Sequence, residues 1–342
     1  MKTYFDDILK IYNESIPWED LSGTNILITG ATGLIGSTLV EVLMSNPHLN
    51  YNVYAAGRNR ERARRRFGKY MSSDSFHFVE YDVMSPIHND IQFDYIIHAA
   101  SDASPNAFLK SPVEIIKANI YGVSNLVDYG LQHNMKRLLY VSSGEVYGEG
   151  DGRIMTEEYS GYIDCLNPRS CYPSSKRTSE TLCVSYASEY DADIVIARPC
   201  HVYGPNFTEV DNRVYAQFIR NILKGDNIVL KSSGDQLRSW CYVVDCVSAL
   251  LYILLKGISG EAYNIADPDS VLTIKQLAEM LAKIGDTKVT IDVPSEMEKN
   301  AYNPITKSVF SVGKLEKLGW RITDNMWEKM NRTVDYLKNN LQ

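Results

Sequence analysis

Residues 26–36 read Ile26-Leu27-Ile28-Thr29-Gly30-Ala31-Thr32-Gly33-Leu34-Ile35-Gly36. A short apolar run typical of a buried strand leads into three glycines, and a helical pattern follows. The glycines permit a tight turn, the close approach of a pyrophosphate, and close packing of the helix on the strand. The first turn of such a helix offers N–H groups to an anion. The spacing is GxxGxxG, whereas the usual dinucleotide fingerprint is GxGxxG. Because the stretch forms the first strand–helix unit, we expect the cofactor phosphates to be bound by Gly30, Thr32, Gly33, Leu34, Ile35 and Gly36.

An alternation of strands and helices continues on both sides of this loop. Apolar runs typical of buried strands lie at 25–29, 52–56, 76–81, 94–99, 137–142 and 193–197, with helical patterns near 35–45, 59–70, 112–133 and 174–190. Continuous apolar strands that alternate with helices predict a parallel sheet covered on both faces. We therefore expect an α/β protein with a Rossmann-type, doubly wound parallel sheet.

The end of the second strand bears on the choice of cofactor. An acidic residue that binds the ribose of NAD is expected there, but the sequence has Gly57-Arg58-Asn59. An arginine at this place can accommodate the 2′-phosphate of NADP. The cofactor is therefore NAD or NADP, and Arg58 favours NADP. We interpret the arginines that follow, at 60, 62 and 64–66, as a solvated helix face.

After Arg198-Pro199 the pattern becomes less regular, with helical segments near 214–224, 245–256, 273–284 and 326–340. We predict an N-terminal helix plus NAD(P)-binding Rossmann domain over residues 1–199. Residues 200–342 form mainly a smaller C-terminal α/β substrate-binding lobe, with a part at about 240–256 returning to the first domain. At the N-terminus, helical spacing of apolar residues predicts an amphipathic helix that packs on the body, through Phe5, Ile8, Leu9 and Tyr12.

A tyrosine and a lysine follow the fifth strand at helical spacing, in Tyr172-Pro173-Ser174-Ser175-Lys176. On a helix the two side chains share a face, and the ammonium is expected to lower the pKa of the phenol toward that of a general base. The fifth strand itself ends at Ser142-Ser143, at the sheet edge where catalytic groups collect. A hydroxyl, a tyrosine and a lysine after a nicotinamide fingerprint indicate alcohol–ketone redox chemistry. Tyr252 and Lys256 have the same spacing, and we interpret them as a structural pair.

These residues resemble the extended short-chain dehydrogenase/reductase superfamily, in its NAD-dependent epimerase/dehydratase family of sugar-nucleotide enzymes, and most of all the UDP-glucuronate decarboxylases. The likeness begins near residue 24 and covers nearly all of the chain that follows. The residues that carry it are His98-Ala99-Ala100-Ser101 with Ser104-Pro105, Ser143-Gly144-Glu145-Val146-Tyr147-Gly148, Pro168-Arg169-Ser170-Cys171-Tyr172 with Lys176-Arg177 and Glu180-Thr181, Asp211-Asn212-Arg213-Val214 with Gln217-Phe218-Ile219, and Gln236-Leu237-Arg238-Ser239 with Tyr242-Val243 and Asp245.

The resemblance implies a role for each of these groups. Tyr172 takes the proton from the sugar O4 hydroxyl, Lys176 holds the cofactor ribose, and Ser143 shares the hydroxyl while a hydride leaves C4. Glu145 is a further catalytic residue. Cofactor contacts are expected from Asp82, Val83, Ala99, Ala100, Ser101, Tyr172, Lys176 and Pro199, besides the glycine loop and Arg58. Substrate contacts are expected from Ser104, Ser143, His201, Asn206, Arg213, Gln217, Arg238 and Lys307, of which the two arginines would meet the pyrophosphate.

The fate of the 4-keto sugar stays open at this point. Gly144 stands where the 4,6-dehydratases have an aspartate, which counts against loss of water. A β-keto acid loses CO₂ readily, so decarboxylation needs little more machinery. Lys307 replaces the arginine of decarboxylases, however, and His201 replaces a usual asparagine. A 4-epimerase, a 4-keto reductase or a dehydratase of the same family therefore remain alternatives, as does a catalytically silent, cofactor-binding sensor or an enzyme for another alcohol.

The composition limits the classes of binding partner that we expect. The net charge of −7 and pI near 5.5 do not favour nucleic acid, for which a basic footprint is usual. We expect no membrane span, no signal peptide, a cytoplasmic location and reduced, mostly buried cysteines. The histidines lack paired-ligand spacing, so no metal is expected. The expected partner is a nucleotide-diphosphate sugar, and the resemblance implies a homodimer through the helices near 112–133 and 172–190, with the loop at 148–170 partly covering the site.

Overall fold

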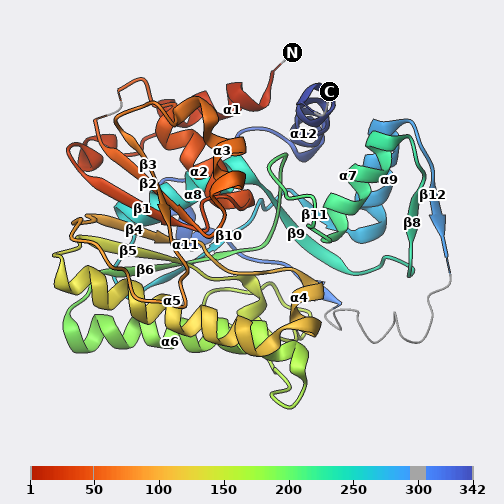
Figure 1. Cartoon of the computed structure of the whole chain (residues 1–342). Helices are drawn as coiled ribbons and strands as arrows, with labels where there is room; N and C mark the ends of the chain where they lie inside the picture. The colour runs from red at the N-terminus through yellow and green to blue at the C-terminus, as the bar shows by residue number, and fades with distance from the viewer. Residues whose placement is uncertain (1, 49, 293–305, 341–342) are drawn as a thin grey trace.

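A parallel sheet of seven strands forms the centre of the part of the chain that the computed structural model describes, residues 2–48, 50–292 and 306–340 (Figure 1). Its order is β3-β2-β1-β4-β5-β6-β10, and every neighbouring pair runs parallel. The strands are β1 (Asn25–Thr29), β2 (Asn52–Gly57), β3 (Phe76–Glu80), β4 (Tyr95–His98), β5 (Arg137–Val141), β6 (Ile194–Pro199) and β10 (Ala262–Ile265). This order confirms the predicted doubly wound α/β fold.

Helices cover both faces of the sheet, and Figure 1 shows α5 and α6 side by side on one of them. These are α5 (Pro112–Gln132) and α6 (Cys171–Tyr190); the opposite face carries α2 (Leu34–Met44), α3 (Arg60–Phe67) and α8 (Val243–Lys256). Side chains of one strand alternate between the two layers. Ile26 and Ile28 belong to the cluster under α2 and α8, whereas Leu27 belongs to the one under α5 and α6. Continuous apolar strands are thus explained by burial on both sides.

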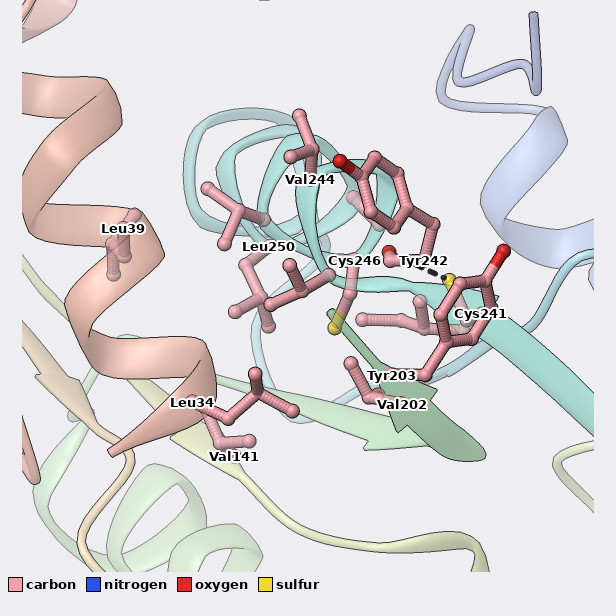
Figure 2. Packing of buried hydrophobic residues seen from close by; sticks show 14 of the residues in the cluster. Leu34, Leu39, Val141, Val202, Tyr203, Cys241, Tyr242, Val244, Cys246 and Leu250 are labelled. Atoms are coloured by element: carbon pink, nitrogen blue, oxygen red, sulfur yellow. Dashed lines mark hydrogen bonds between the residues drawn. The ribbon is translucent and has the colours of Figure 1, made fainter. Parts of the chain in front are cut away.

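The layer beneath α2 and α8 joins the two parts of the chain. Figure 2 shows Leu34 of α2 and Leu250 of α8 in one buried cluster with Tyr203 and Tyr242. Tyr203 ends β7 (His201–Tyr203) and Tyr242 ends β9 (Leu237–Tyr242), and their ring centroids lie 5.6 Å apart. The second lobe is therefore anchored to the first through a continuous apolar core.

The second lobe is built on short strands. β9 pairs with β7, β11 (Val271–Thr273) and β13 (Lys307–Ser308), while β8 (Ile228–Leu230) pairs with β12 (Val289–Ile291). The helices α7 (Val214–Lys224) and α9 (Ile274–Gly285) lie beside these strands (Figure 1). The part that returns to the first sheet includes α8 and also β10, so it extends beyond residue 256. A domain boundary at residue 199 remains our proposal.

The N-terminal helix α1 (Tyr4–Lys10) packs on the body, but with a different face from the one we expected. Tyr4, Ile8 and Ile11 are buried, whereas Phe5 and Leu9 are 41% and 50% exposed. Polar contacts explain the rotation. The hydroxyl of Tyr4 donates to Glu41 at 2.6 Å, and buried Asp7 accepts from Arg332 of α12 (Met326–Asn340) at 2.6 Å. The two ends of the described chain consequently lie close together (Figure 1).

Candidate functional site

The glycine loop between β1 and α2 is shaped by close backbone approaches. Gly30 has a φ of +66°, and a Cβ there would lie 2.7 Å from the Cα of Ala100 and from the carbonyl oxygen of Ala99. A Cβ on Gly36 would lie 2.3 Å from the carbonyl oxygen of Gly30. Glycine is therefore required at both positions, because the helix and the neighbouring strand end leave no room for a side chain.

Gly33 faces a more open space. Within the described part of the chain, and apart from its chain neighbours, the one atom within 4 Å of a Cβ at that position is the carbonyl oxygen of Gly30, at 3.2 Å. Gly33 is also the N-cap of α2, and as a glycine it has no side chain that could cap the first N–H groups of the helix. Uncapped N–H groups next to an open glycine fit a pyrophosphate. These residues are thus suited to hold the phosphates of a dinucleotide.

The residues expected near the adenosine lie at the ends of β2 and β3. Arg58 is 77% exposed, and its Nη1 lies 3.9 Å from a carboxylate oxygen of Asp82. The other oxygen of Asp82 accepts from the backbone N–H of Met84, and the carbonyl of Val83 accepts from Asn125 on α5. Arg58 is therefore free to swing toward a phosphate, since an exposed pair at this distance is weak.

The end of β4 is tied to both outer helices. Ser101 donates to Oδ1 of Asn119 on α5 at 2.8 Å, and Nδ2 of Asn119 donates to Ser175 on α6 at 2.8 Å. His98, in β4 itself, is buried and shares a 2.8 Å hydrogen bond with Thr29. Burial lowers the pKa of His98 to about 3, so the imidazole is neutral. This network fixes the backbone of Ala99, Ala100 and Ser101 beside the glycine loop.

Tyr172, Lys176 and Ser143 meet at the carboxyl ends of β4 and β5. Tyr172 and Lys176 lie in the first two turns of α6, and the Lys176 ammonium is 5.8 Å from the centre of the Tyr172 ring. Lys176 Nζ also donates to the carbonyl of Val141, at the end of β5, at 2.9 Å. The Ser143 hydroxyl acts on the Tyr172 hydroxyl as a polar partner that lowers the pKa of the phenol. The hydroxyl–tyrosine–lysine group that the sequence predicted is thus assembled in space.

The pKa of Tyr172 departs from our expectation. Burial raises it above its ordinary value, and the groups that lower it are Ser143 and Arg213 rather than Lys176. Burial also lowers the pKa of Lys176 to about 7, so the ammonium loses part of its charge near neutrality. The loss of hydration on burial therefore affects the pKa values of Tyr172 and Lys176 more than their placement on one helix face does.

Glu145 is held in place by an arginine that we had given no role. It lies in the short helix η4 (Gly144–Tyr147), and both of its oxygens accept hydrogen bonds from Arg169, each at 3.1 Å. Arg169 belongs to η5 (Pro168–Ser170), directly before α6. A carboxylate in a bidentate pair is an acceptor with its lone pairs engaged, which makes it a poor proton donor.

Gly144 is covered by a side chain from the second lobe. A Cβ at this position would lie 2.5 Å from Cζ of Phe310, whose ring centroid is 5.5 Å from that of Tyr147. Phe310 is buried, and its backbone N–H donates to Ser239. The place of the dehydratase aspartate is therefore taken by an apolar ring. No local signal predicted this contact, because Phe310 lies far away in the sequence.

Arg213, Arg238 and His201, all from the second lobe, are linked to this group and to one another by electrostatic interactions. Arg238 is 4% exposed and donates to the carbonyl of Leu237; burial lowers its pKa to about 10, and Glu145 raises it. Arg213 makes a bidentate pair with Asp211, and its charge acts on both Tyr172 and His201. Burial lowers the pKa of His201 to about 3, so His201 contributes a neutral ring.

Other residues expected to bind substrate have partners elsewhere. Asn206 Nδ2 donates to Tyr4, Thr38 and Glu41 in a buried cluster beneath α1, so the structure does not bring it to the group around Tyr172. Two of the others make local contacts, since Ser104 caps α4 (Pro105–Lys110) and Gln217 donates to the carbonyl of Asn212. Lys307 donates to the carbonyl of Gly152, which lies far away in the sequence, in the loop at 148–170. Pro199 ends β6, the strand that leads to His201.

The second tyrosine–lysine pair lies apart from the site. Lys256 Nζ is 4.8 Å from the centre of the Tyr252 ring and donates to the carbonyl of Ser15. The pair thus fastens the N-terminal segment to α8. The cysteines are free thiols, of which Cys165 is exposed, Cys200 is half-buried, and the other four are buried.

Among the described residues, no group of three or more His, Cys, Asp or Glu is placed to hold a metal ion. Nor does any helix in the described ranges combine the length and the apolar character needed to cross a membrane.

Comparison with known proteins agrees with this geometry. UDP-glucuronic acid decarboxylase 6 of Arabidopsis thaliana is 33% identical over 87% of this chain and 84% of its own length. UDP-glucuronic acid decarboxylase 1 of Xenopus tropicalis is 31% identical over 93% of this chain and 73% of its own. The structure of UDP-glucose 4-epimerase with UDP-glucose from Thermotoga maritima aligns with a TM-score of 0.78 and 25% identity, covering 93% of this chain and all of that one. Residues 26–266 match the model of the NAD dependent epimerase/dehydratase family, and the chain belongs to that family of enzymes.

Proposed function

We propose that this enzyme oxidises C4 of a nucleotide-diphosphate sugar, and that the overall reaction is the decarboxylation of UDP-glucuronate. The observation that carries the first step is the grouping of buried Tyr172 with Lys176, whose ammonium lies 5.8 Å from the tyrosine ring centre and is held at the end of β5, and with Ser143, which lowers the pKa of the phenol. The end of β4 packs against the glycine loop suited to a dinucleotide and is connected through Asn119 to Ser175 on α6, the helix of Tyr172 and Lys176. Such a grouping would serve no purpose in a cofactor-binding sensor without catalysis.

In this mechanism each residue has one task. Tyr172 accepts the proton of the O4 hydroxyl, and Ser143 holds the same oxygen by a hydrogen bond. Lys176 is fixed by the Val141 carbonyl, from where it can hold the cofactor ribose. The nicotinamide, when bound, accepts the hydride from C4. The sugar is left as a 4-ketone, with its C6 carboxylate β to the new carbonyl.

The surroundings of Gly144 support decarboxylation over dehydration. Loss of water from C5 and C6 requires a general acid, but Phe310 fills the space beside Gly144 and Arg169 engages Glu145. Loss of CO₂ requires no such acid, because the electrons of the C5–C6 bond flow into the C4 ketone and leave an enolate. C5 would then take a proton and C4 would regain the hydride, so that the overall reaction is redox-neutral. The relatives named UDP-glucuronic acid decarboxylase support the same choice.

A nucleotide-sugar 4-epimerase is the second candidate. Lys307, in place of an arginine, donates to the backbone of Gly152, and lysine is a point charge rather than a carboxylate clamp. Epimerisation needs only room for the keto sugar to turn over, and no acid beyond Tyr172. The structural similarity to a UDP-glucose 4-epimerase agrees with this alternative.

The remaining parts of the proposal concern the cofactor and the assembly. The family is NAD-dependent, and the exposed Arg58 adds NADP as an option. We further propose a cytoplasmic homodimer formed through α5 and α6. Apolar side chains exposed on these helices support such an interface: Val113, Ile116, Tyr121, Leu131, Val184 and Tyr190.

Mass spectrometry of the nucleotide sugars tests the proposal. The protein is incubated with UDP-glucuronate and either NAD or NADP, with the Tyr172→Phe variant as control. We expect a product lighter by CO₂ that is absent with the variant. A new chromatographic isomer of unchanged mass would replace the decarboxylase by the 4-epimerase. No conversion of any uridine, cytidine or thymidine diphosphate sugar would contradict the proposed substrate class.

A further inference from the structure

Arg169 connects the loop at 148–170 to the beginning of α6. Its two terminal nitrogens donate to separate oxygens of Glu145, each at 3.1 Å, and both side chains are about three-quarters buried. The backbone N–H of Arg169 donates in turn to Asn167. A bidentate pair fixes the plane of the guanidinium as well as its position.

The same guanidinium packs on an aromatic ring. Its central carbon lies 5.5 Å from the ring centroid of Phe108, on α4. Phe108 in turn stacks on Tyr172, with the centroids 4.8 Å apart and the planes 21° from parallel. Phe108 is 2% exposed and Tyr172 is 5% exposed, so neither ring has room to tilt independently.

We propose that Arg169 and Phe108 are positioning residues for Tyr172. Glu145 anchors the guanidinium, the guanidinium holds Phe108, and Phe108 keeps the Tyr172 ring in the orientation that brings its hydroxyl to Ser143. Glu145 then acts through Arg169 rather than by transferring a proton. The inference rests on the proposed role of Tyr172 as the base.

The charges around Tyr172 give the two residues different signatures. The polar and charged groups that act on its hydroxyl are Ser143, Glu145, Arg213 and Asp102, while Lys176 on α6 lies 5.8 Å from the centre of the ring. Glu145 raises the pKa of Tyr172, and Arg169 offsets that charge at close range. Loss of Arg169 therefore raises the pKa further, whereas loss of the Phe108 ring leaves the charges in place.

Kinetics of Arg169→Met and Phe108→Leu test the two roles. Both variants should lower kcat by about 10-fold or more while KM for the nucleotide sugar stays within about threefold, since a misplaced base affects the chemical step. In Arg169→Met the decrease in kcat should be accompanied by a shift of the pH–rate profile, in which the limb that reports ionisation of Tyr172 moves to higher pH. Phe108→Tyr should restore the rate, because the stack is kept.

The loop supplies a matched control. Arg153 also pairs with a carboxylate, Asp151, and lies 5.7 Å from an aromatic ring, that of Tyr159, but it is 75% exposed. Arg153→Met should therefore leave kcat and the pH profile unchanged. An effect as large as that of Arg169→Met would show that any lost arginine in the loop suffices, which overturns the positioning role.

Fluorine NMR separates this inference from the proposed function. In protein labelled with fluorotyrosine, the Tyr172 resonance is the one that disappears in Tyr172→Phe. It should shift or broaden in Arg169→Met and Phe108→Leu, and stay in place in Arg153→Met. Arg169→Gln and Phe108→Met replace any variant that fails to fold. If the resonance stays in place and kcat is unchanged in Arg169→Met and Phe108→Leu, the inference is overturned. If the resonance moves but the protein converts no nucleotide sugar, only the proposed function is contradicted.

Discussion

At the scale of single residues, the candidate site depends on Tyr172 and its neighbours. Ser143 lowers the pKa of its hydroxyl and the ring stacks on Phe108, while Lys176 donates a hydrogen bond to the backbone at the end of β5. Because burial raises the pKa of Tyr172, the phenolate needs these polar partners more than an exposed tyrosine would.

Replacing Tyr172 by phenylalanine should lower kcat by about 10²- to 10⁴-fold, the usual contribution of a positioned base. Cofactor binding should change little, because the glycine loop is untouched. Initial rates and equilibrium titration with NAD measure the two effects. The matched control is Tyr252→Phe, on the other tyrosine–lysine pair, which should keep its rate. Full activity in Tyr172→Phe would remove the assigned base.

Arg58 determines cofactor preference in this account. Arg58→Ala should weaken the binding of NADP by about tenfold or more, since a charge-assisted contact to the 2′-phosphate is lost. The affinity for NAD should change by no more than about twofold. Titrations with both cofactors check this. Arg60→Ala is the control, because Arg60 is also exposed and pairs with Glu80. Equal losses of affinity for NAD and NADP in Arg58→Ala would exclude a role of Arg58 in binding the 2′-phosphate.

At the scale of elements, the first and last helices close the molecule. Arg332 of α12 reaches Asp7 of α1 at 2.6 Å, and both side chains are 6% exposed. It also donates to Asp324, which pairs with Lys10. Removing one partner of a buried ion pair leaves the other charge buried, poorly solvated and without a counter-charge.

Arg332→Met should therefore lower the free energy of unfolding by about 3–5 kcal/mol. Lys2→Met is the control, since Lys2 makes an exposed pair with the same Asp324 and should cost no more than about 1 kcal/mol. Urea unfolding of both variants measures the difference. Similar midpoints for Arg332→Met and the parent protein would show that α12 contributes little to closing the fold.

The elements of the main sheet could be predicted because their apolar runs are continuous and their glycine loop is local. Short strands such as β13, with two residues, are too brief to show a period. The prediction of which face of α1 is buried was wrong, because the rotation of the helix is set by Asp7 and Arg332, which lie at opposite ends of the chain. Gly144 and Phe310, or Glu145 and Arg169, meet only in the folded chain, so the sequence alone carried no sign of these contacts.

At the scale of the whole molecule, the two lobes share one core and both contribute residues to the candidate site. Phe310 from the second lobe covers Gly144 of the first, and buried Arg238 lies within electrostatic reach of Glu145. A ligand that contacts both lobes should thus stabilise the entire fold rather than one part of it.

Thermal unfolding with NAD and UDP tests this coupling. At about 100-fold excess over its dissociation constant each ligand adds about 2.7 kcal/mol of stability, so Tm should rise in two steps. Arg238→Ala should lose the UDP step and keep the NAD step, relative to its own unliganded Tm. Arg321→Ala, on the exposed surface, should keep both. A full UDP step in Arg238→Ala would separate Arg238 from the pyrophosphate.

The most direct test of the central claim is hydride removal from C4. UDP-glucuronate carrying deuterium at C4 is mixed with the enzyme and NAD, and the reduced nicotinamide is followed by absorbance and by mass spectrometry. We expect transient reduction that is slower than with the unlabelled sugar, deuterium on the nicotinamide, and reduction that is slower by about 10²- to 10⁴-fold with Tyr172→Phe. A bound sugar that never reduces the cofactor, or equal reduction by Tyr172→Phe, would contradict the claim.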